Sequence, residues 1–204
     1  MSTSPRRQAR GSERRETIID AALTLMVREG PHAVSHRRVA TEADVPLAAT
    51  TYYFTSRDEL LALAGQRLAD EWARHATTHA KELHDTCATT PAQAAEILTK
   101  VALPYGTELE IRAYYEHAVV LGRSDEEAHR RVSASNSYCA AINTALIKTK
   151  ITMAEEVIIA CIDGAVLLAM RDGLPIRERV HATLLELFVE TGTHAPAHHT
   201  TTYP

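Results

Sequence analysis

The chain has 204 residues, of which 45% are hydrophobic, and its formal net charge is −4. This length allows one medium domain or a small domain with a medium one, and no apolar run approaches the roughly 18 residues that a membrane span needs. The N-terminus, MSTSPRRQARGSERR, lacks the apolar core of a secretory signal. We therefore expect a cytoplasmic protein without a membrane partner.

The charge is distributed unevenly along the chain. Residues 1–60 contain nine Arg against eight Asp and Glu, whereas residues 61–204 contain 13 basic and 18 acidic side chains. Positive charge gathered at one end is typical of a protein that binds a polyanion there, because phosphate contacts dominate affinity for nucleic acid. The sequence therefore predicts that any DNA contact lies near the N-terminus.

The first segments are a basic arm and a helix. Residues 1 to about 12 are rich in Ser, Arg and Gly and predict a flexible basic arm, which either reaches along a DNA groove or is a disordered tail. From Glu13 to Glu29 apolar residues recur at helical spacing, and Gly30 with Pro31 ends the pattern.

Two short helical patterns follow between Ser35 and Leu60, separated by Asp44-Val45-Pro46. Ser35 is a suitable N-cap for the first pattern. Pro46 suits the start of the second, because its fixed φ and missing N–H do no harm in a first turn. Ser56 then caps a third helix. This is the layout of a helix-turn-helix.

The stretch ADVPLAATTYYFTSRDELL resembles the helix-turn-helix of the TetR family of one-component regulators. The matching residues are Ala43, Val45, Phe54, Ser56 and Leu60, with Arg57 in the usual Lys position. The departures are Asp44 for a turn Gly, Pro46 for Ser and Ala48 for a second Gly. Asp tolerates turn conformations and Pro suits a helix start, so we interpret these residues as a variant of the same turn.

The resemblance implies that the second short helix reads double-stranded DNA. The residues it assigns to DNA contact are His36, Arg37, Thr51, Tyr52, Tyr53 and, as the phosphate anchor, Arg57. Hydroxyls and methyls of Thr and Tyr can meet base edges and phosphates. Of the two tyrosines we expect Tyr53 to be the reader and Tyr52 to pack with Phe54 and Leu60.

The remaining sequence predicts further helices, which gives an all-α fold of about nine helices. Their expected limits are Ser56 to about Thr86, Pro91 to about Leu103, Thr107–Leu121, Ser124 to about Lys148, Thr152–Arg171 and Ile176–Glu190. We expect a three-helix head at residues 13–55 and a helical ligand-binding and dimerisation domain at residues 56–192. Residues 193–204 are expected to be a disordered tail.

The last two helices predict a homodimer. Thr152–Arg171 is apolar nearly all round, so one side needs cover beyond the chain's own core. A four-helix dimer interface is also what the family resemblance implies. Changing Leu184 to Glu is expected to give monomers.

Aromatic and polar residues of the C-terminal part suggest a pocket for an unidentified small-molecule effector. The candidates are Trp72, His75, Tyr105, Tyr114, His117, Asn136 and Asn143. Core packing explains each of them singly about as well. His75, His79 and His84 have the spacing of possible metal ligands, but we interpret them as polar residues near the far end of an amphipathic helix. We expect neither a metal nor a cofactor.

The preferred interpretation is a repressor released from a palindromic operator by a small molecule. A ligand-independent, architectural DNA-binding protein whose C-terminal domain only dimerises is the alternative. A helical enzyme would need a convergent set such as Glu108, Glu116 and His117, but Glu116 and His117 are neighbours on diverging helix faces. Cys87, Cys139 and Cys161 show no CxxC spacing and are expected to be buried apolar residues.

Overall fold

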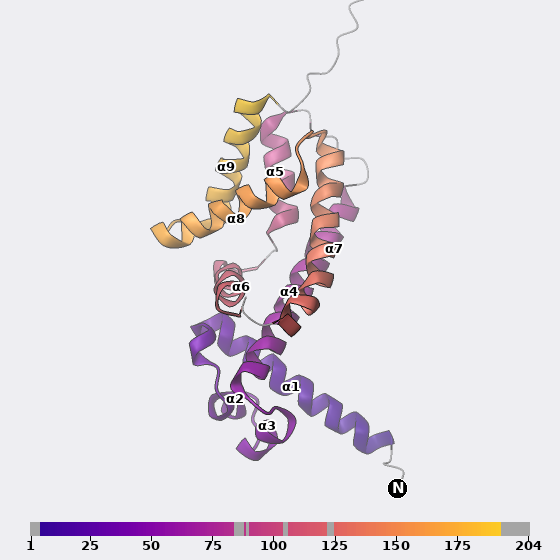
Figure 1. Cartoon of the computed structure of the whole chain (residues 1–204), viewed down its shortest axis with the longest axis vertical. Coiled ribbons are helices and arrows are strands. Elements are labelled where there is room, and N and C mark those ends of the chain that lie inside the picture. The colour runs from indigo at the N-terminus through magenta and orange to yellow at the C-terminus, as the bar shows by residue number, and fades with distance from the viewer. Residues whose placement is uncertain (1–4, 84–87, 89, 104–105, 122–124, 193–204) are drawn as a thin grey trace, which may run out of the picture. The chain divides into compact units, whose positions relative to one another are not determined.

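The computed structural model describes residues 5–83, 88, 90–103, 106–121 and 125–192, with the backbone alone at 5–8, 118–121 and 125–134. Its elements in this part of the chain are helical (Figure 1). They are α1 Pro5–Glu29, the 3-10 turn η1 Pro31–Ala33, α2 His36–Glu42, α3 Leu47–Tyr53, α4 Arg57–Glu82, α5 Pro91–Ala102, α6 Glu108–Leu121, α7 Asp125–Thr149, α8 Glu155–Asp172 and α9 Ile176–Thr191. The predicted all-α fold of about nine helices is confirmed.

Helix α1 begins earlier than the sequence predicted. It starts at Pro5, so the backbone of residues 5–12 is helical, and the role of a basic arm for this segment stays a prediction. Arg, Gln and Ala are good helix formers and Pro is favoured in a first turn. Further along α1, the Arg15 guanidinium lies 5.3 Å from the centre of the ring of Phe54, the residue that ends α3. The hydroxyl of Tyr53 lies 3.6 Å from the position of a Cβ built on Gly11.

Contacts divide the chain into two compact units. One contains Met1–Glu71 and Leu109–Ser133, and the other contains Trp72–Glu108 and Ala134–Pro204. Helix α4 therefore contributes to both units, and nearly all of α6 belongs with the helix-turn-helix. The functional boundary expected after residue 55 stays a prediction.

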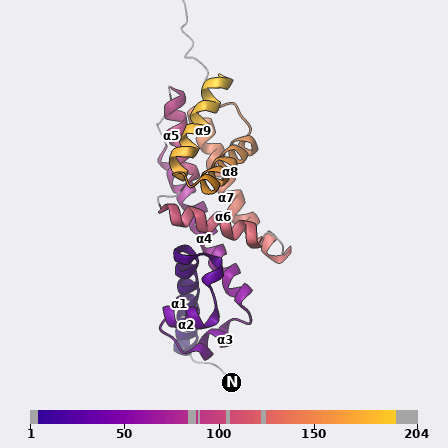
Figure 2. The same ribbon diagram turned by 90° about the vertical axis from the view of Figure 1, so that its left-hand side faces the viewer.

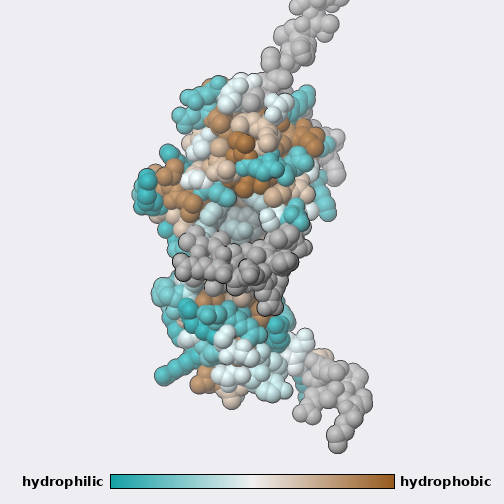
Figure 3. Space-filling model, viewed as in Figure 1, coloured by the Kyte–Doolittle hydropathy of each residue, from teal (hydrophilic) through white to brown (hydrophobic). Residues whose placement is uncertain are grey.

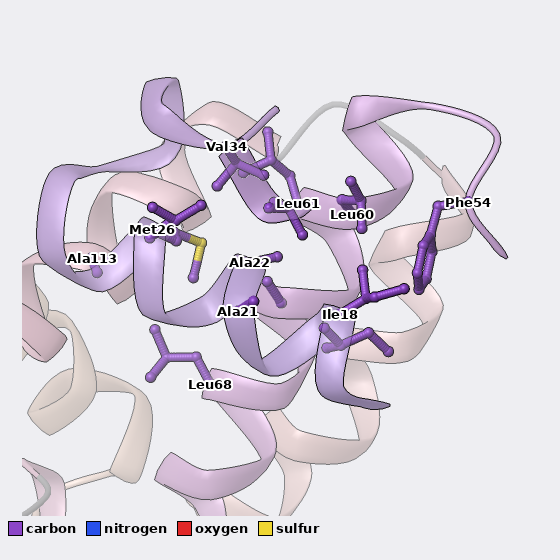
Figure 4. Close-up of a cluster of buried hydrophobic side chains, with 14 residues drawn as sticks. Ile18, Ala21, Ala22, Met26, Val34, Phe54, Leu60, Leu61, Leu68 and Ala113 are labelled. Carbon is purple, nitrogen blue, oxygen red and sulfur yellow. The ribbon is translucent and has the colours of Figure 1, made fainter. Parts of the chain in front are cut away.

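The first unit has a core built around α1. Ile18, Ala22 and Met26 recur one turn apart on α1 and are fully buried. They face Leu61 of α4, and Ala113 of α6 belongs to the same cluster (Figure 4). Burial of these side chains holds α1 against the helix-turn-helix. The side of α3 that faces away from this core stays exposed.

The second unit packs α9 against both α5 and α8, as Figures 1 and 2 show from two directions. Four residues of α9 spaced four apart are fully buried: Ile176, Val180, Leu184 and Phe188. Leu184 therefore lies in the core of its own chain. Leu184→Glu would place a charge in this core, so the variant does not separate loss of the dimer from loss of the fold, and the expected monomer stays a prediction.

Several expectations fall on residues that the structure does not describe. These are the proposed pocket residue Tyr105, the N-cap Ser124, His84, Cys87 and the tail 193–204. Cys139 and Cys161 are free thiols and half-buried, not fully buried as expected. In the part of the chain that is described, no helix combines the length and apolarity needed to cross a membrane.

Candidate functional site

The turn between α2 and α3 has the geometry that the sequence predicted. The Ser35 hydroxyl accepts a hydrogen bond from the Arg38 N–H at 3.4 Å and caps α2. Asp44 adopts a φ of 51°, in the left-handed region where Gly is usual and Asp is tolerated. Pro46 is the N-cap of α3, with a φ of −59°. The two departures from the family pattern thus produce the same reversal between the helices.

Thr50 fixes α3 against α2. Its side chain is fully buried. The hydroxyl donates to the carbonyl oxygen of Leu47 at 2.8 Å and lies 3.5 Å from that of His36. A hydrogen bond satisfies the buried hydroxyl, and its methyl group fills the space between the helices.

The outward face of α3 is defined by Leu47, Ala48, Thr51 and Tyr52, all exposed. Leu47 is 50% exposed and Tyr52 82% exposed. Positions four apart in a helix share a face, so the pairs 47 with 51 and 48 with 52 form one continuous surface. Exposed apolar side chains on so short a helix are unusual in a surface that has no partner.

The exposures of the two tyrosines are the reverse of those expected, and which of them reads DNA stays a prediction. Tyr52 is the exposed one and does not pack with Phe54 and Leu60. Tyr53 is half-buried and packs against the core of the first unit. The two rings meet edge to face, with centres 5.0 Å apart and an interplanar angle of 86°. Tyr53 therefore supports the orientation of Tyr52.

Arg57 contacts the chain's own backbone instead of presenting its whole guanidinium to solvent. Its Nε donates to the carbonyl oxygen of Val34 at 2.8 Å, and its Nη2 donates to that of Pro31 at 2.9 Å. Its Nη1 lies 3.6 Å from a carboxylate oxygen of Asp58. Arg57 thus joins the start of α4 to the segment between α1 and α2, which the sequence pattern could not reveal.

A cluster of ion pairs, which sequence inspection missed, braces α1 against α2. Arg28 donates to both carboxylate oxygens of Glu42, at 3.1 and 3.0 Å, and also pairs with Glu29. Arg38 pairs with Glu29 at 2.5 Å. The hydrogen bond from Arg38, aided by Arg28, lowers the pKa of Glu29. The hydrogen bond from Arg28 lowers the pKa of Glu42.

The two predicted contact residues at the start of α2 differ in accessibility. His36 is half-buried, and its Nδ1 is buried without a hydrogen-bond partner in the described part of the chain. Arg37 is exposed, and none of the contacts described for this chain engages its guanidinium. Beside it lies a depression of about 480 Å³, lined by Arg37, Ala40, Thr41, Asp44, Val45 and Leu47.

The predicted effector residues lie in both contact units. Trp72 is buried and its indole N–H donates to the carbonyl oxygen of Ala102 at 2.8 Å. His75 is half-buried on the next turn, whereas Asn136 and Asn143 are exposed on α7. That these residues line one pocket stays a prediction.

Two predicted effector residues belong to the helix-turn-helix unit. Tyr114 packs against its core and meets Tyr115 edge to face, with ring centres 5.5 Å apart. His117 is buried, and its imidazole occupies the space next to Gly65. Both side chains therefore also serve packing.

The rival enzymatic set does not converge in a site. Glu108 accepts hydrogen bonds from the backbone N–H groups of Ile176, at 2.9 Å, and Arg177, at 3.4 Å, so it caps the start of α9. Glu116 lies near Gly30 in the other unit. No group of three or more His, Cys, Asp or Glu suited to a metal occurs among the residues that the structure describes.

A cavity of about 650 Å³ lies within the second unit and was not expected from the sequence. Its lining residues are Glu96, Thr99, Lys100, Gly106, Arg177, Glu178 and His181. Lys100 pairs with Glu96 at 2.6 Å, and Arg177 donates to the carbonyl oxygens of Leu103 and Gly106 at 3.2 and 3.3 Å. Lys100, Glu96 and Arg177 in the cavity wall therefore each have a partner within the chain.

Comparison with known sequences finds a family profile and two relatives that match part of the chain. Residues 18–64 match the profile of the bacterial regulatory proteins, tetR family. The nicotine-responsive transcriptional repressor HdnoR of Paenarthrobacter nicotinovorans is 39% identical over 62 residues, which are 30% of this chain and 32% of that protein. An uncharacterized HTH-type transcriptional regulator in the dhlA 5' region of Xanthobacter autotrophicus is 32% identical over 114 residues, 54% of each chain. The chain thus spans about a third and about half of these two relatives.

Comparison with solved structures covers nearly the whole chain. The multidrug binding protein EbrR complexed with imidazole superposes with a TM-score of 0.62 and 26% identity, over 91% of this chain and 97% of that one. A TetR-family member from Streptomyces coelicolor A3 gives a TM-score of 0.61 and 27% identity, over 86% and 98%. The family and both curated relatives are transcriptional regulators, not enzymes. Residues 18–64 thus carry a helix-turn-helix of the tetR family of bacterial regulatory proteins, and the fold of the chain resembles that of solved proteins of this kind.

Proposed function

We propose that this protein is a cytoplasmic, homodimeric repressor that binds a palindromic operator in double-stranded DNA and is released by a small molecule. The observation that carries the proposal is the outward face of α3, which lies inside the segment that matches the family and is exposed from Leu47 to Tyr52. In a helix-turn-helix the second helix enters the major groove. The outward face then meets base edges.

Dimer formation is supported by apolar side chains that remain exposed on α8 and α9. Val157, Cys161, Gly164 and Leu168 lie on one face of α8 and are exposed or half-buried, while Val189 on α9 is 61% exposed. Hydrophobic surface is visible at the free end of α8 in Figure 3. An antiparallel pairing of α8 and α9 with the same helices of a second copy would cover these side chains.

Two copies are needed because one helix-turn-helix makes few base contacts. A dimer reads two half-sites about one helical turn, or a multiple of it, apart. The symmetry of the dimer then predicts an inverted repeat.

The proposed effector is supported by the relatives. EbrR structures contain imidazole, ethidium, proflavin or malachite green, and HdnoR is named as nicotine-responsive. A ligand can release DNA only if it binds more tightly to the conformation with the lower operator affinity. Helix α4, which belongs to both contact units, is the element through which we propose that this change reaches α3.

The proposal is tested first by selecting duplexes from a random library with the full-length protein. We expect one inverted repeat to be enriched and bound about 10³-fold more tightly than a scrambled duplex at physiological salt. Absence of any enriched sequence from a folded, dimeric preparation would contradict the proposal.

Effector control is tested separately on the selected operator. Malachite green and nicotine are the first probes, and binding to the protein alone is measured by calorimetry before operator release is measured by anisotropy. Ethidium and proflavin are unsuitable for the second step because they insert between base pairs themselves. If a broad small-molecule panel neither binds nor releases the operator, the ligand-independent architectural alternative is favoured.

A further inference from the structure

The chemistry of α3 is uncommon for a reading helix, since its sequence LAATTYY contains no charged or amide side chain. Guanine is usually read by Arg or Lys, and adenine by Asn or Gln, each through two hydrogen bonds in the major groove. Helix α3 has none of these residue types. Direct readout by α3 must therefore use apolar contacts and hydroxyl groups.

The two threonine hydroxyls of α3 are engaged within the helix. That of Thr50 is buried and bonded to the Leu47 carbonyl oxygen. Thr51 is exposed, but its hydroxyl donates to the carbonyl oxygen of Ala48 at 3.3 Å, which leaves its methyl group on the outward face. Leu47 and Ala48 add further methyl groups, and Tyr52 adds an aromatic ring with a terminal hydroxyl.

Arginines near α3 do not supply the missing contacts. Arg28 and Arg38 pair with Glu42 and Glu29, and Arg57 donates to backbone carbonyl oxygens. Arg37 is exposed on α2 and is available for a phosphate. Charge around the reading helix is therefore suited to holding the DNA backbone and not to distinguishing bases.

We propose that α3 recognises its operator through the C5-methyl groups of thymine, so that each half-site carries thymines at the base pairs facing Leu47, Ala48 and Thr51. Thymine is the base that presents a methyl group in the major groove, and Ala and the methyl of Thr are suited to contact it. The inference rests on the proposed function, because it specifies how the DNA-binding face discriminates.

The test uses the full-length protein and the operator selected with it. Each thymine of one half-site is replaced in turn by deoxyuridine, which keeps the base pairing and removes only the methyl group. We expect two or more positions at which affinity falls about fourfold, the value for one apolar carbon withdrawn from water. Deoxyuridine in the flanking duplex is the matched control and should have no effect.

A double-mutant cycle identifies the protein partner of one such methyl group. Thr51→Ser removes a methyl but keeps the hydroxyl that bonds Ala48. The variant should bind the thymine operator several-fold more weakly than the wild type, and it should lose its sensitivity to deoxyuridine at a single position. The melting temperature of Thr51→Ser is the control: a value equal to that of the wild type would show that the fold is preserved.

The outcomes separate this inference from the proposed function. Tight, specific binding of an operator whose half-sites tolerate deoxyuridine at every position would overturn the thymine-methyl readout and leave the regulator proposal intact. Enriched half-sites without thymine would do the same. Failure to select any sequence would overturn both.

Discussion

The imidazole of His117 on α6 occupies the space that Gly65 on α4 leaves by having no side chain. A Cβ built on Gly65 would overlap the His117 ring, and His117 is 6% exposed. Ala113, one turn earlier on α6, belongs to the core cluster of the helix-turn-helix unit. Helix α6 is therefore part of the packing that holds α4 and α1 together.

Gly65→Ala should destabilise the protein. The added methyl group must displace the His117 ring from a closely packed site, which typically costs about 1–3 kcal/mol, although Ala favours a helix over Gly by about 1 kcal/mol. The free energy of unfolding is measured in urea. The double variant Gly65→Ala with His117→Ala should recover most of the loss.

Gly11→Ala is the matched control for that experiment. Gly11 also lies inside a helix, and a Cβ there meets only the Tyr53 hydroxyl at an ordinary 3.6 Å. This variant should be neutral or slightly more stable than the wild type. If Gly65→Ala changed the free energy of unfolding no more than Gly11→Ala does, the close packing of His117 on Gly65 would contribute nothing to stability.

The variants Arg57→Ala and Arg37→Ala should differ in their effects on stability and on the salt dependence of operator binding. Arg57→Ala removes two hydrogen bonds to the carbonyl oxygens of Val34 and Pro31, so we expect a loss of stability of about 1–3 kcal/mol and an unchanged salt dependence of operator binding. Arg37→Ala should leave the melting temperature unchanged and reduce the slope of log affinity against log salt by about one per site.

These two variants decide whether the family's phosphate-anchor position keeps that role here. A reduced salt slope for Arg57→Ala, with an unchanged melting temperature, would restore the assignment that the sequence resemblance favours. An unchanged slope for Arg37→Ala would remove Arg37 from the DNA contacts.

The ion pairs between α1 and α2 predict a dependence of stability on acid. Arg38 and Arg28 lower the pKa of Glu29, and Arg28 lowers that of Glu42. The stabilisation is therefore present at pH values above the unfolded-state pKa of about 4.3 and is lost as the pH falls through the lower folded-state pKa. Because the pairs are exposed, we expect a small effect.

Glu42→Gln tests this dependence. The variant should melt at a lower temperature than the wild type at pH 7, and the difference between the two should shrink progressively below pH 4.3. A difference that stayed constant down to pH 2.5 would show that the charge of Glu42 contributes nothing.

Leu168→Glu should convert the protein to monomers. Leu168 lies on the uncovered face of α8 and is 38% exposed in the single chain, so the charge is tolerated in the monomer and costs free energy only in an apolar interface. Sedimentation velocity measures the change. Leu109→Glu, at a 50% exposed Leu of α6, is the control and should stay dimeric. A dimeric Leu168→Glu would place the interface elsewhere.

Local features of the fold could be predicted from the sequence because they depend on neighbouring residues. The Ser35 cap and the turn at Asp44 both follow from spacing within a few residues. The early start of α1 was missed, because the apolar residues that revealed the helix begin only at Ile18, and the approach of Gly11 to Tyr53 joins residues far apart in the chain.

Side-chain roles at the candidate site were harder to predict for the same reason. Arg57 bonds a carbonyl 23 residues away and Arg28 bonds Glu42 across 14 residues, and no periodicity reveals either pair. The exposures of Tyr52 and Tyr53 depend on which side of a seven-residue helix faces α1. A helix of about two turns with small residues on several sides does not fix that orientation.

The central claim is that the outward face of α3 reads DNA, and it is tested most directly by changing Thr51 and Tyr52 to Ala together. Both side chains are exposed, so the fold and the dimer should be preserved, whereas Tyr53→Ala would leave a gap in the core. Fluorescence anisotropy compares the wild type and this variant on the selected operator and on a scrambled duplex. We expect operator affinity to fall about 100-fold or more, to the level of the scrambled duplex. If the variant bound the operator as tightly as the wild type, the outward face of α3 would not be the surface that reads DNA.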